Sequence, residues 1–205
     1  MRLRAVVVGL TLLNAHLAQA ASGGRSSAVA PEPVVGAVSI ASPVDGDVSW
    51  LAVGDVAPEF SYIGADGQWE RFGALLNHGP VVLVFGMREG DMKSLESART
   101  VFMDLGVTPA VAMDMRPGSA VRLARRVGLS ATVVADPRCA IATVFNCLDP
   151  ANLHHAPAYF VVDEHHRIRA IGHGALPTPL QLAALSARSL GKPVPESAYS
   201  MSVRY

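Results

Sequence analysis

The sequence predicts one α/β domain in which a central mixed β-sheet is flanked by helices. Three apolar segments, residues 81–85, 108–114 and 132–136, have the length of buried strands and alternate with segments of helical periodicity. This alternation, with short connections, favours parallel strands joined by right-handed crossovers. Residues 158–163 and 167–172 flank a polar turn, and this pattern predicts an antiparallel hairpin.

Shorter elements precede the central strand. Residues 60–63 and 69–72 predict two short strands around Asp66-Gly67, a dipeptide that favours positive φ angles in a turn. Residues 72–76 predict a short helical turn, closed by the Asn-His-Gly-Pro sequence that follows.

Helices are expected after the strands. Met92 and Leu95 fall near one face of a helix predicted over residues 92–105, which ends at Gly106. A second helix, predicted over residues 118–127, carries three arginines on what we interpret as a solvated face. The remaining helices are predicted over residues 138–145 and 179–190.

Composition limits the classes of function. The chain has 205 residues, 50% of them hydrophobic, which suits one domain with appendages. The formal net charge is +0 and no basic stripe occurs, which argues against a nucleic-acid partner. The 2 cysteines are too few for a disulfide scaffold.

The ends of the chain differ in composition from its centre. Residues 1–20 have a positive start, a short apolar run and the small-residue sequence Ala18-Gln19-Ala20, a pattern typical of a cleaved signal peptide. We therefore expect export, to a bacterial periplasm, and no membrane association after cleavage. Residues 21–50 predict a flexible linker, 51–192 the folded domain, and 193–205 a C-terminal tail.

Five segments resemble a known family, in the same order along the chain. They are Gly54-Asp55-Val56-Ala57-Pro58-Glu59-Phe60, Asp66-Gly67-Gln68, Pro80 to Phe85, Asp136-Pro137 with Ala142 and Phe145, and Ala156 to Asp163. Together they resemble the peroxiredoxin and redoxin branch of the thioredoxin superfamily over roughly residues 52–175. The resemblance implies a thioredoxin-like fold with a cis-proline loop at Pro157. It also implies a thiol-dependent antioxidant or thiol-disulfide oxidoreductase.

The catalytic residues that this resemblance implies are missing. A thioredoxin C-x-x-C would fall on Gly90-Asp91-Met92-Lys93, and the peroxidatic cysteine of a peroxiredoxin near Lys93 or Ser94. The family's peroxide-polarising arginine would fall close to Pro157. Because a thiolate is the nucleophile in both chemistries, we expect neither reaction at the usual place.

Cys139 and Cys147 are the only thiols, and they could supply a relocated redox pair. If residues 138–145 are helical, the two cysteines are separated by a rise of about 12 Å. A disulfide requires Cα atoms within about 7 Å, so pairing would need the helix to end early. The alternatives to catalysis are a structural disulfide, or one partly buried thiol and one loop thiol that stay unpaired.

His154 and His155 immediately precede Ala156-Pro157. In the fold that the sequence resembles, this loop abuts the start of the helix that carries Asp91, Lys93 and Ser94. The resulting polar cluster could bind an anion, a polypeptide backbone or a metal ion. Four methionines near the same strand ends, Met87, Met92, Met113 and Met115, make a soft metal such as copper conceivable. The histidine spacing fits no established metal signature.

Three functions follow as hypotheses. The first is a binding or accessory module that has lost the peroxidatic centre and holds an extended polypeptide in the groove around Pro157. The second is an enzyme that uses Cys139 and Cys147. The third is a metal-handling protein that uses His154 and His155. No cofactor is expected, and the sequence leaves the oligomeric state open.

Overall fold

The structure is a computed structural model, and it describes residues 50–64 and 67–196. The predicted signal peptide (1–20), residues 21–49 of the predicted linker, Asp66 of the predicted turn, and residues 197–205 of the predicted tail lie outside the described residues.

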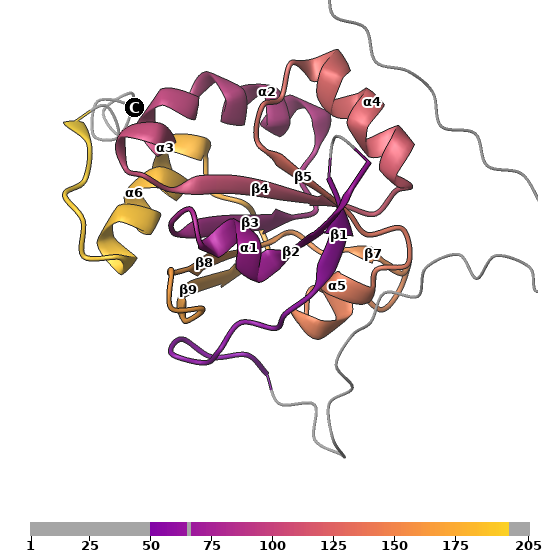
Figure 1. Ribbon diagram of the computed structural model, residues 1–205, viewed down its shortest axis with the longest axis horizontal. Coiled ribbons are helices and arrows are strands. Elements are labelled where there is room, and N and C mark those ends of the chain that lie inside the picture. Colours follow the sequence, from indigo (N-terminus) through magenta and orange to yellow (C-terminus); the bar gives the residue numbers. More distant parts are fainter. Residues whose placement is uncertain (1–49, 65–66, 197–205) are drawn as a thin grey trace, which may run out of the picture. The chain divides into compact units, whose positions relative to one another are not determined.

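A five-stranded mixed sheet organises the domain, in the strand order β5-β4-β3-β8-β9 (Figure 1). Its strands are β3 (Val81–Phe85), β4 (Thr108–Met113), β5 (Thr132–Ala135), β8 (Ala158–Val162) and β9 (Ile168–His173). The helices are α1 (Phe72–Leu76), α2 (Glu89–Ser97), α3 (Arg99–Asp104), α4 (Pro117–Val127), α5 (Ala140–Val144) and α6 (Pro179–Ser189). Two small hairpins add β1 (Ser61–Ile63) with β2 (Trp69–Arg71), and β6 (Leu148–Asp149) with β7 (His154–His155).

The pairing of the strands confirms the predicted mixed sheet. Strands β3, β4 and β5 are parallel neighbours, with Leu83 opposite Ala110 and Val111 opposite Val133. Strand β8 pairs antiparallel with both β3 and β9. The sheet therefore combines the predicted parallel crossovers on one side of β3 with the predicted hairpin on the other.

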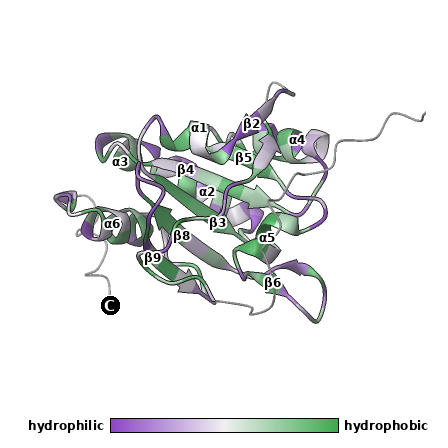
Figure 2. Ribbon diagram, turned by 60° about the horizontal axis from the view of Figure 1, so that its bottom comes forward, coloured by the Kyte–Doolittle hydropathy of each residue, from purple (hydrophilic) through white to green (hydrophobic). Residues whose placement is uncertain are grey.

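Strand β3 lies at the centre of the sheet (Figure 2). It is buried on both faces, as its unbroken apolar sequence predicts. Leu83 and Phe85 face a core that α1 and α5 cover. Val82 and Val84 face a second core, which α2, α3, α4 and α6 cover. The alternation of side chains along a strand thus places helices on both faces of the sheet.

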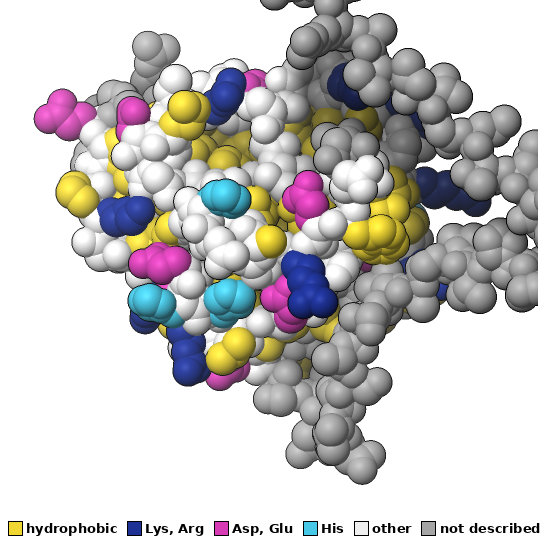
Figure 3. Space-filling model, in the orientation of Figure 1, with side chains coloured by type: hydrophobic (Ala, Val, Ile, Leu, Met, Phe, Trp, Pro, Cys, Tyr) yellow, Lys and Arg dark blue, Asp and Glu magenta, His cyan; other side chains and the backbone are white. Residues whose placement is uncertain are grey.

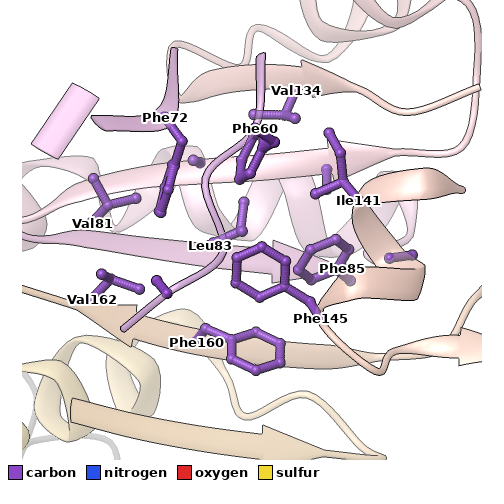
Figure 4. Packing of buried hydrophobic residues seen from close by; sticks show 14 of the residues in the cluster. Phe60, Phe72, Val81, Leu83, Phe85, Val134, Ile141, Phe145, Phe160 and Val162 are labelled. Atoms are coloured by element: carbon purple, nitrogen blue, oxygen red, sulfur yellow. The ribbon is translucent and has the colours of Figure 1, made fainter. Parts of the chain in front are cut away.

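Aromatic rings fill the core under α1 and α5. Phe85, Phe145 and Phe160 converge from β3, the end of α5 and β8 (Figure 4). The rings of Phe145 and Phe160 lie edge to face with centroids 4.9 Å apart, an arrangement that aromatic quadrupoles favour. Phe60 and Phe72 extend the cluster toward α1. This packing holds α5 against the sheet.

Two differences from the sequence prediction concern the segments around the predicted site residues. The helix predicted over residues 92–105 begins at Glu89 and divides at Ala98 into α2 and α3. The β6–β7 hairpin, residues 148–155, was not predicted, because its strands have two residues each and alternation needs a longer segment. Both differences lie beside the residues that the sequence singles out for function.

The described surface carries charges of both signs. Acidic and basic side chains are interspersed on the face shown in Figure 3. Among residues 50–64 and 67–196, no helix has the length and apolarity that crossing a bilayer would require.

Candidate functional site

A groove of about 540 Å³ lies beside Pro157 at the end of β3. We call it the Pro157 groove. Its lining comes from the turn after β3 (residues 86–88), from α2 at positions 90, 91 and 94, and from residues 175–179, together with Val84 and Leu182. Three of the predicted binding residues, Asp91, Ser94 and Pro157, line this groove. The sequence prediction missed the wall formed by residues 175–179, which comprises the irregular segment before α6 and the first residue of that helix and lies far from α2 in the sequence.

Two backbone segments that line the groove are in close contact. Gly86 has a φ of +65°, and a Cβ atom at this position would lie 2.8 Å from the nitrogen of Pro157. The described residues contain no cis peptide bond, so the Ala156–Pro157 bond is trans and the expected cis-proline is wrong. The trans isomer is the more stable form of an X–Pro bond unless its surroundings impose the other.

The backbone around Pro157 is already hydrogen-bonded within the chain. The N–H of Ala156 donates to the carbonyl of Cys147 at 2.8 Å. The N–H of Gly174 donates to the carbonyl of Pro157, also at 2.8 Å. These two backbone groups are therefore already engaged and do not pair with an extended polypeptide in the groove. A ligand of the groove would have to be held mainly by side chains.

The first turn of α2 carries carboxylates where a redox protein would carry a thiol. Glu89 and Asp91 lie in this turn, where negative charge is favoured by the helix dipole. The carboxylate of Asp91 accepts a hydrogen bond from the N–H of Arg88 at 3.3 Å. The hydroxyl of Ser94 donates to the carbonyl of Gly90 at 3.1 Å. This turn is thus stabilised by its own side chains.

The other predicted binding residues do not join the groove. Lys93 points to solvent and lies 3.8 Å from Glu89, one turn earlier on α2. His154 is exposed, and its Nδ1 lies 2.7 Å from a carboxylate oxygen of Asp114. The polar cluster of two imidazoles with Asp91, Lys93 and Ser94, expected from the sequence, is therefore not formed.

His155 has the opposite environment to its neighbour, because adjacent residues of β7 face opposite sides. Its side chain is 2% exposed, and its Nε2 lies 3.0 Å from Oδ2 of Asp136. The same carboxylate oxygen accepts the N–H of Ala142 in α5. The imidazole packs edge to face on Phe85 with centroids 5.4 Å apart. Nδ1 of His155 is buried and has no hydrogen-bond partner.

A second, smaller hollow of about 240 Å³ lies next to His155. We call it the His155 hollow. It is formed at the ends of β3 and β4 together with α2 and α4, and its lining includes Met87, Met92, Met113 and Met115. The sequence indicated this gathering of methionines only through their positions near strand ends. It did not indicate that the hollow would exclude His154 and include His155.

Cys139 and Cys147 are free and buried. Both belong to the core under α1 and α5, whereas Met92 and Leu95 of α2 belong to the core on the other side of the sheet. Neither thiol therefore lies at the start of α2. Helix α5 ends at Val144, earlier than predicted, yet the two sulfur atoms are not bonded to each other.

The environments of both thiols oppose ionisation. Burial raises the pKa of Cys139, and the carboxylates of Asp136 and Asp114 raise it further. Burial, with Asp136 and then Cys139, raises the pKa of Cys147 still more strongly. The sulfur of Cys139 donates to the carbonyl of Leu153 at 3.3 Å. These are features of packed thiols, since an activated cysteine has a lowered pKa and an electropositive, partly exposed setting.

Comparison with known proteins gives a likeness of fold. No protein-family model and no curated protein sequence matches the chain. The crystal structure of peroxidoxin BcpB from Mycobacterium tuberculosis matches with a TM-score of 0.57 and 15% identity, covering 75% of this chain and 98% of that one. AhpC of Enterococcus faecalis matches with a TM-score of 0.61 and 15% identity, over 68% of this chain and 92% of that one.

A third match has the same character. The reduced 2-Cys peroxiredoxin of Plasmodium vivax matches with a TM-score of 0.58 and 13% identity, over 67% of this chain and 82% of that one. At such low identity, structural likeness establishes the fold and leaves the chemistry to be argued from the residues. The chain has a thioredoxin-like fold.

Proposed function

We propose that this chain is an exported, redoxin-like protein that works as a binding or accessory module and has no thiol chemistry at the usual site. The observation that carries the proposal is the composition of the α2 start. Residues 88–91, at the position where the fold can lower the pKa of a thiol, are Arg-Glu-Gly-Asp. The chain therefore keeps a scaffold that could activate a cysteine thiol but has no cysteine at this position.

The two remaining cysteines support the same proposal. A relocated enzyme would need a thiolate that a substrate can reach. Cys139 and Cys147 are 7% and 1% exposed, and the pKa of each is raised by burial and by Asp136. Catalysis through these thiols, the alternative function, would require the core under α5 to open.

The Pro157 groove is the surface that we propose for binding. Its floor and sides include apolar side chains such as Met87 and Leu176, while Asp91, Ser94 and Thr178 supply polar groups. Apolar walls with a few polar groups suit an extended polypeptide whose side chains enter the groove. Because the N–H of Ala156 and the carbonyl of Pro157 are already bonded, we propose recognition by side-chain contacts in place of strand pairing.

Export rests on the sequence of residues 1–20. We propose cleavage after Ala20 and a bacterial periplasmic location. The mass of protein recovered from the periplasmic fraction checks this step. A species beginning at Ala21 is expected, and an uncleaved chain retained in the cytoplasm would contradict it.

The binding proposal is tested with a displayed library of random 12-residue peptides selected on the exported protein. Two exposed serines of α2 give a matched pair of variants. Ser94 lines the groove and Ser97 does not, and the hydroxyl of each donates to a backbone carbonyl four residues earlier at 3.1 Å. Ser94→Arg would fill the groove, whereas Ser97→Arg adds the same charge outside it.

Selected peptides should bind wild type and Ser97→Arg equally and bind Ser94→Arg at least tenfold more weakly, as measured by fluorescence polarisation. Amide chemical shifts of residues 86–94 and 175–179 should change on binding. A library that yields no enriched peptide, or peptides that bind both variants equally, would overturn the proposed role of the groove.

A further inference from the structure

We propose that the arginines of α4 form a second contact surface for the polypeptide partner and bind its acidic side chains. The surface is a hollow of about 760 Å³, which we call the α4 hollow. Its lining consists of Met115, Ser119, Arg122, Leu123, Arg125 and Arg126. The inference rests on the proposed function, because it assigns a charge pattern to the polypeptide that the Pro157 groove is proposed to hold.

The first observation is the position of the α4 hollow. Helix α2, which lines the Pro157 groove, lies beside α4 (Figure 1). The His155 hollow shares Gly86 and Met87 with the Pro157 groove, and it shares Met115 and Leu123 with the α4 hollow. The three hollows therefore adjoin one another, and the path from the groove leads to α4.

The second observation is the charge of α4. Residues 117–127 include three arginines and no acidic residue. All three arginines are exposed, and positions three or four apart lie about 5–6 Å from each other on the surface of a helix. A guanidinium group pairs with a carboxylate through two parallel hydrogen bonds. The α4 hollow therefore suits a ligand that carries carboxylates.

The third observation is how these charges are paired within the chain. Arg126 lies 2.8 Å from Glu89 of α2. Arg122 donates a hydrogen bond to the uncharged hydroxyl of Ser119 at 3.0 Å. The side chain of Arg125 has no hydrogen bond or ion pair with another described residue. Two of the three positive charges, those of Arg122 and Arg125, are therefore not balanced by a carboxylate in the described part of the chain.

The neighbouring charges favour a polypeptide over a flat anionic surface such as a membrane. Glu89 and Asp91 are exposed on α2, beside α4. A membrane of anionic lipids that reached α4 would also approach these carboxylates, and like charges repel. An extended polypeptide is narrow, so it can place single acidic side chains on Arg122 or Arg125. A 12-residue peptide spans about 40 Å, whereas packed helices lie about 8–10 Å apart, so one peptide can contact both the groove and α4.

Between the groove and α4 we expect the peptide to be apolar. Four methionines line the His155 hollow. Its two carboxylates, Glu89 and Asp114, lie 2.8 Å and 2.7 Å from Arg126 and His154. These carboxylates disfavour an acidic side chain at this point. The inferred partner therefore has apolar residues between the part that enters the Pro157 groove and an acidic end that lies on α4.

The test uses the peptides selected on the exported protein and a matched pair of charge reversals. Arg125→Glu and Arg188→Glu each replace an exposed arginine in the last turn of a helix, so both lose the same favourable interaction with the helix dipole. Arg188 lies on α6 and lines none of the three hollows. The two variants therefore differ in their distance from the inferred contact and not in their change of charge.

The selected peptides should be enriched in Asp or Glu near one end. In fluorescence polarisation they should bind Arg125→Glu at least fivefold more weakly than wild type and bind Arg188→Glu within twofold of wild type. Replacement of the acidic residues of a peptide by Asn or Gln should weaken its binding to wild type and should not weaken its binding to Arg125→Glu. This coupling would not arise from a variant that is merely misfolded.

Peptides that lose affinity for Ser94→Arg but bind Arg125→Glu as tightly as wild type would overturn the inference and leave the groove intact. Peptides without acidic enrichment would also overturn it. Binding to phosphatidylglycerol vesicles that Arg125→Glu abolishes would assign the arginines to a membrane surface and overturn the polypeptide contact.

The opposite result separates the two proposals. Peptides that are sensitive to Arg125→Glu and insensitive to Ser94→Arg would support the contact on α4 and overturn the role of the groove. A library without enriched peptides would overturn both. The α4 contact and the proposed function of the groove are therefore distinguished by which variant loses the peptides.

Discussion

Gly86 and Pro157 meet backbone to backbone in the lining of the Pro157 groove. A Cβ atom added to Gly86 would lie 2.8 Å from the nitrogen of Pro157 and 2.9 Å from its Cα. The φ of Gly86, +65°, is also in the region that side chains disfavour. The turn from β3 into α2 and the segment entering β8 are therefore fixed relative to each other by a position that only glycine fits.

Replacement of Gly86 by alanine should lower the free energy of unfolding by about 2–3 kcal/mol, from backbone strain and the forced displacement of Pro157. Urea unfolding measures this change. Gly90 gives a matched control, because its added Cβ would meet nothing within 4 Å and alanine favours a helix. Gly90→Ala should be neutral or stabilise by about 0.5–1 kcal/mol. Equal effects at both positions would show that the contact at Pro157 is unimportant.

Cys139 and Cys147 should react slowly with a thiol reagent in the folded protein, because burial raises the pKa of both. At pH 8, modification by 5,5′-dithiobis(2-nitrobenzoate) should be at least 100-fold slower than in guanidinium chloride. In denaturant, two thiols per chain should react. Fast reaction of either cysteine in the folded protein would show an accessible thiolate that the structure does not have.

A cysteine placed at the start of α2 should behave differently from both native cysteines. Gly90 is exposed in the first turn, so Gly90→Cys in a Cys139→Ala, Cys147→Ala background tests the scaffold alone. The helix dipole should lower the pKa of the new thiol below about 8.5, although Glu89 and Asp91 oppose this shift. The rate of alkylation by iodoacetamide, followed against pH, gives the pKa. A value above that of a free cysteine would mean that the scaffold no longer favours a thiolate.

Asp163 should make stability depend on acid pH. Burial alone would raise its pKa, but hydrogen bonds from the N–H of Arg167, from the Arg169 side chain and from the N–H of His165 together lower it. A lowered pKa means that the folded state favours the carboxylate. Its contribution is therefore complete above the unfolded pKa of about 3.9 and is lost as pH falls through the folded value.

Asp163→Ala should therefore cost about 2 kcal/mol at pH 7, through the loss of hydrogen bonds to a charged group. The difference from wild type should shrink as pH falls below about 4. Urea unfolding at pH 7 and at pH 3 measures it. Glu164→Ala is the control, since Glu164 is exposed in the same turn. A difference that stays constant with pH would exclude the ionised carboxylate as its cause.

The sequence predicted the central sheet because residues 81–85, 108–113 and 158–162 are apolar runs whose burial requires no knowledge of their neighbours. It placed Asp91, Ser94 and Pro157 together because, in the family that the sequence resembles, the loop that ends at the proline lies against the helix after the central strand. The β6–β7 hairpin could not be predicted in this way, because its strands have two residues each.

The β6–β7 hairpin also gives His154 and His155 their different environments. Pairing of Leu148 with His155 places one imidazole in the core on Asp136 and leaves the other on the surface with Asp114. In the sequence the two histidines are adjacent and equivalent. Their difference arises from long-range packing against Phe85 and α5, which no local pattern contains.

The central claim is that the chain has a thioredoxin-like fold but does not catalyse thiol-dependent peroxide or disulfide reduction. Peroxide reduction with dithiothreitol, and insulin reduction, should be measured on the exported protein and on a Cys139→Ser, Cys147→Ser variant. We predict that both proteins give the rate of the protein-free reaction. Turnover by the wild-type chain that disappears in the double variant would contradict the claim and identify the chain as a thiol enzyme.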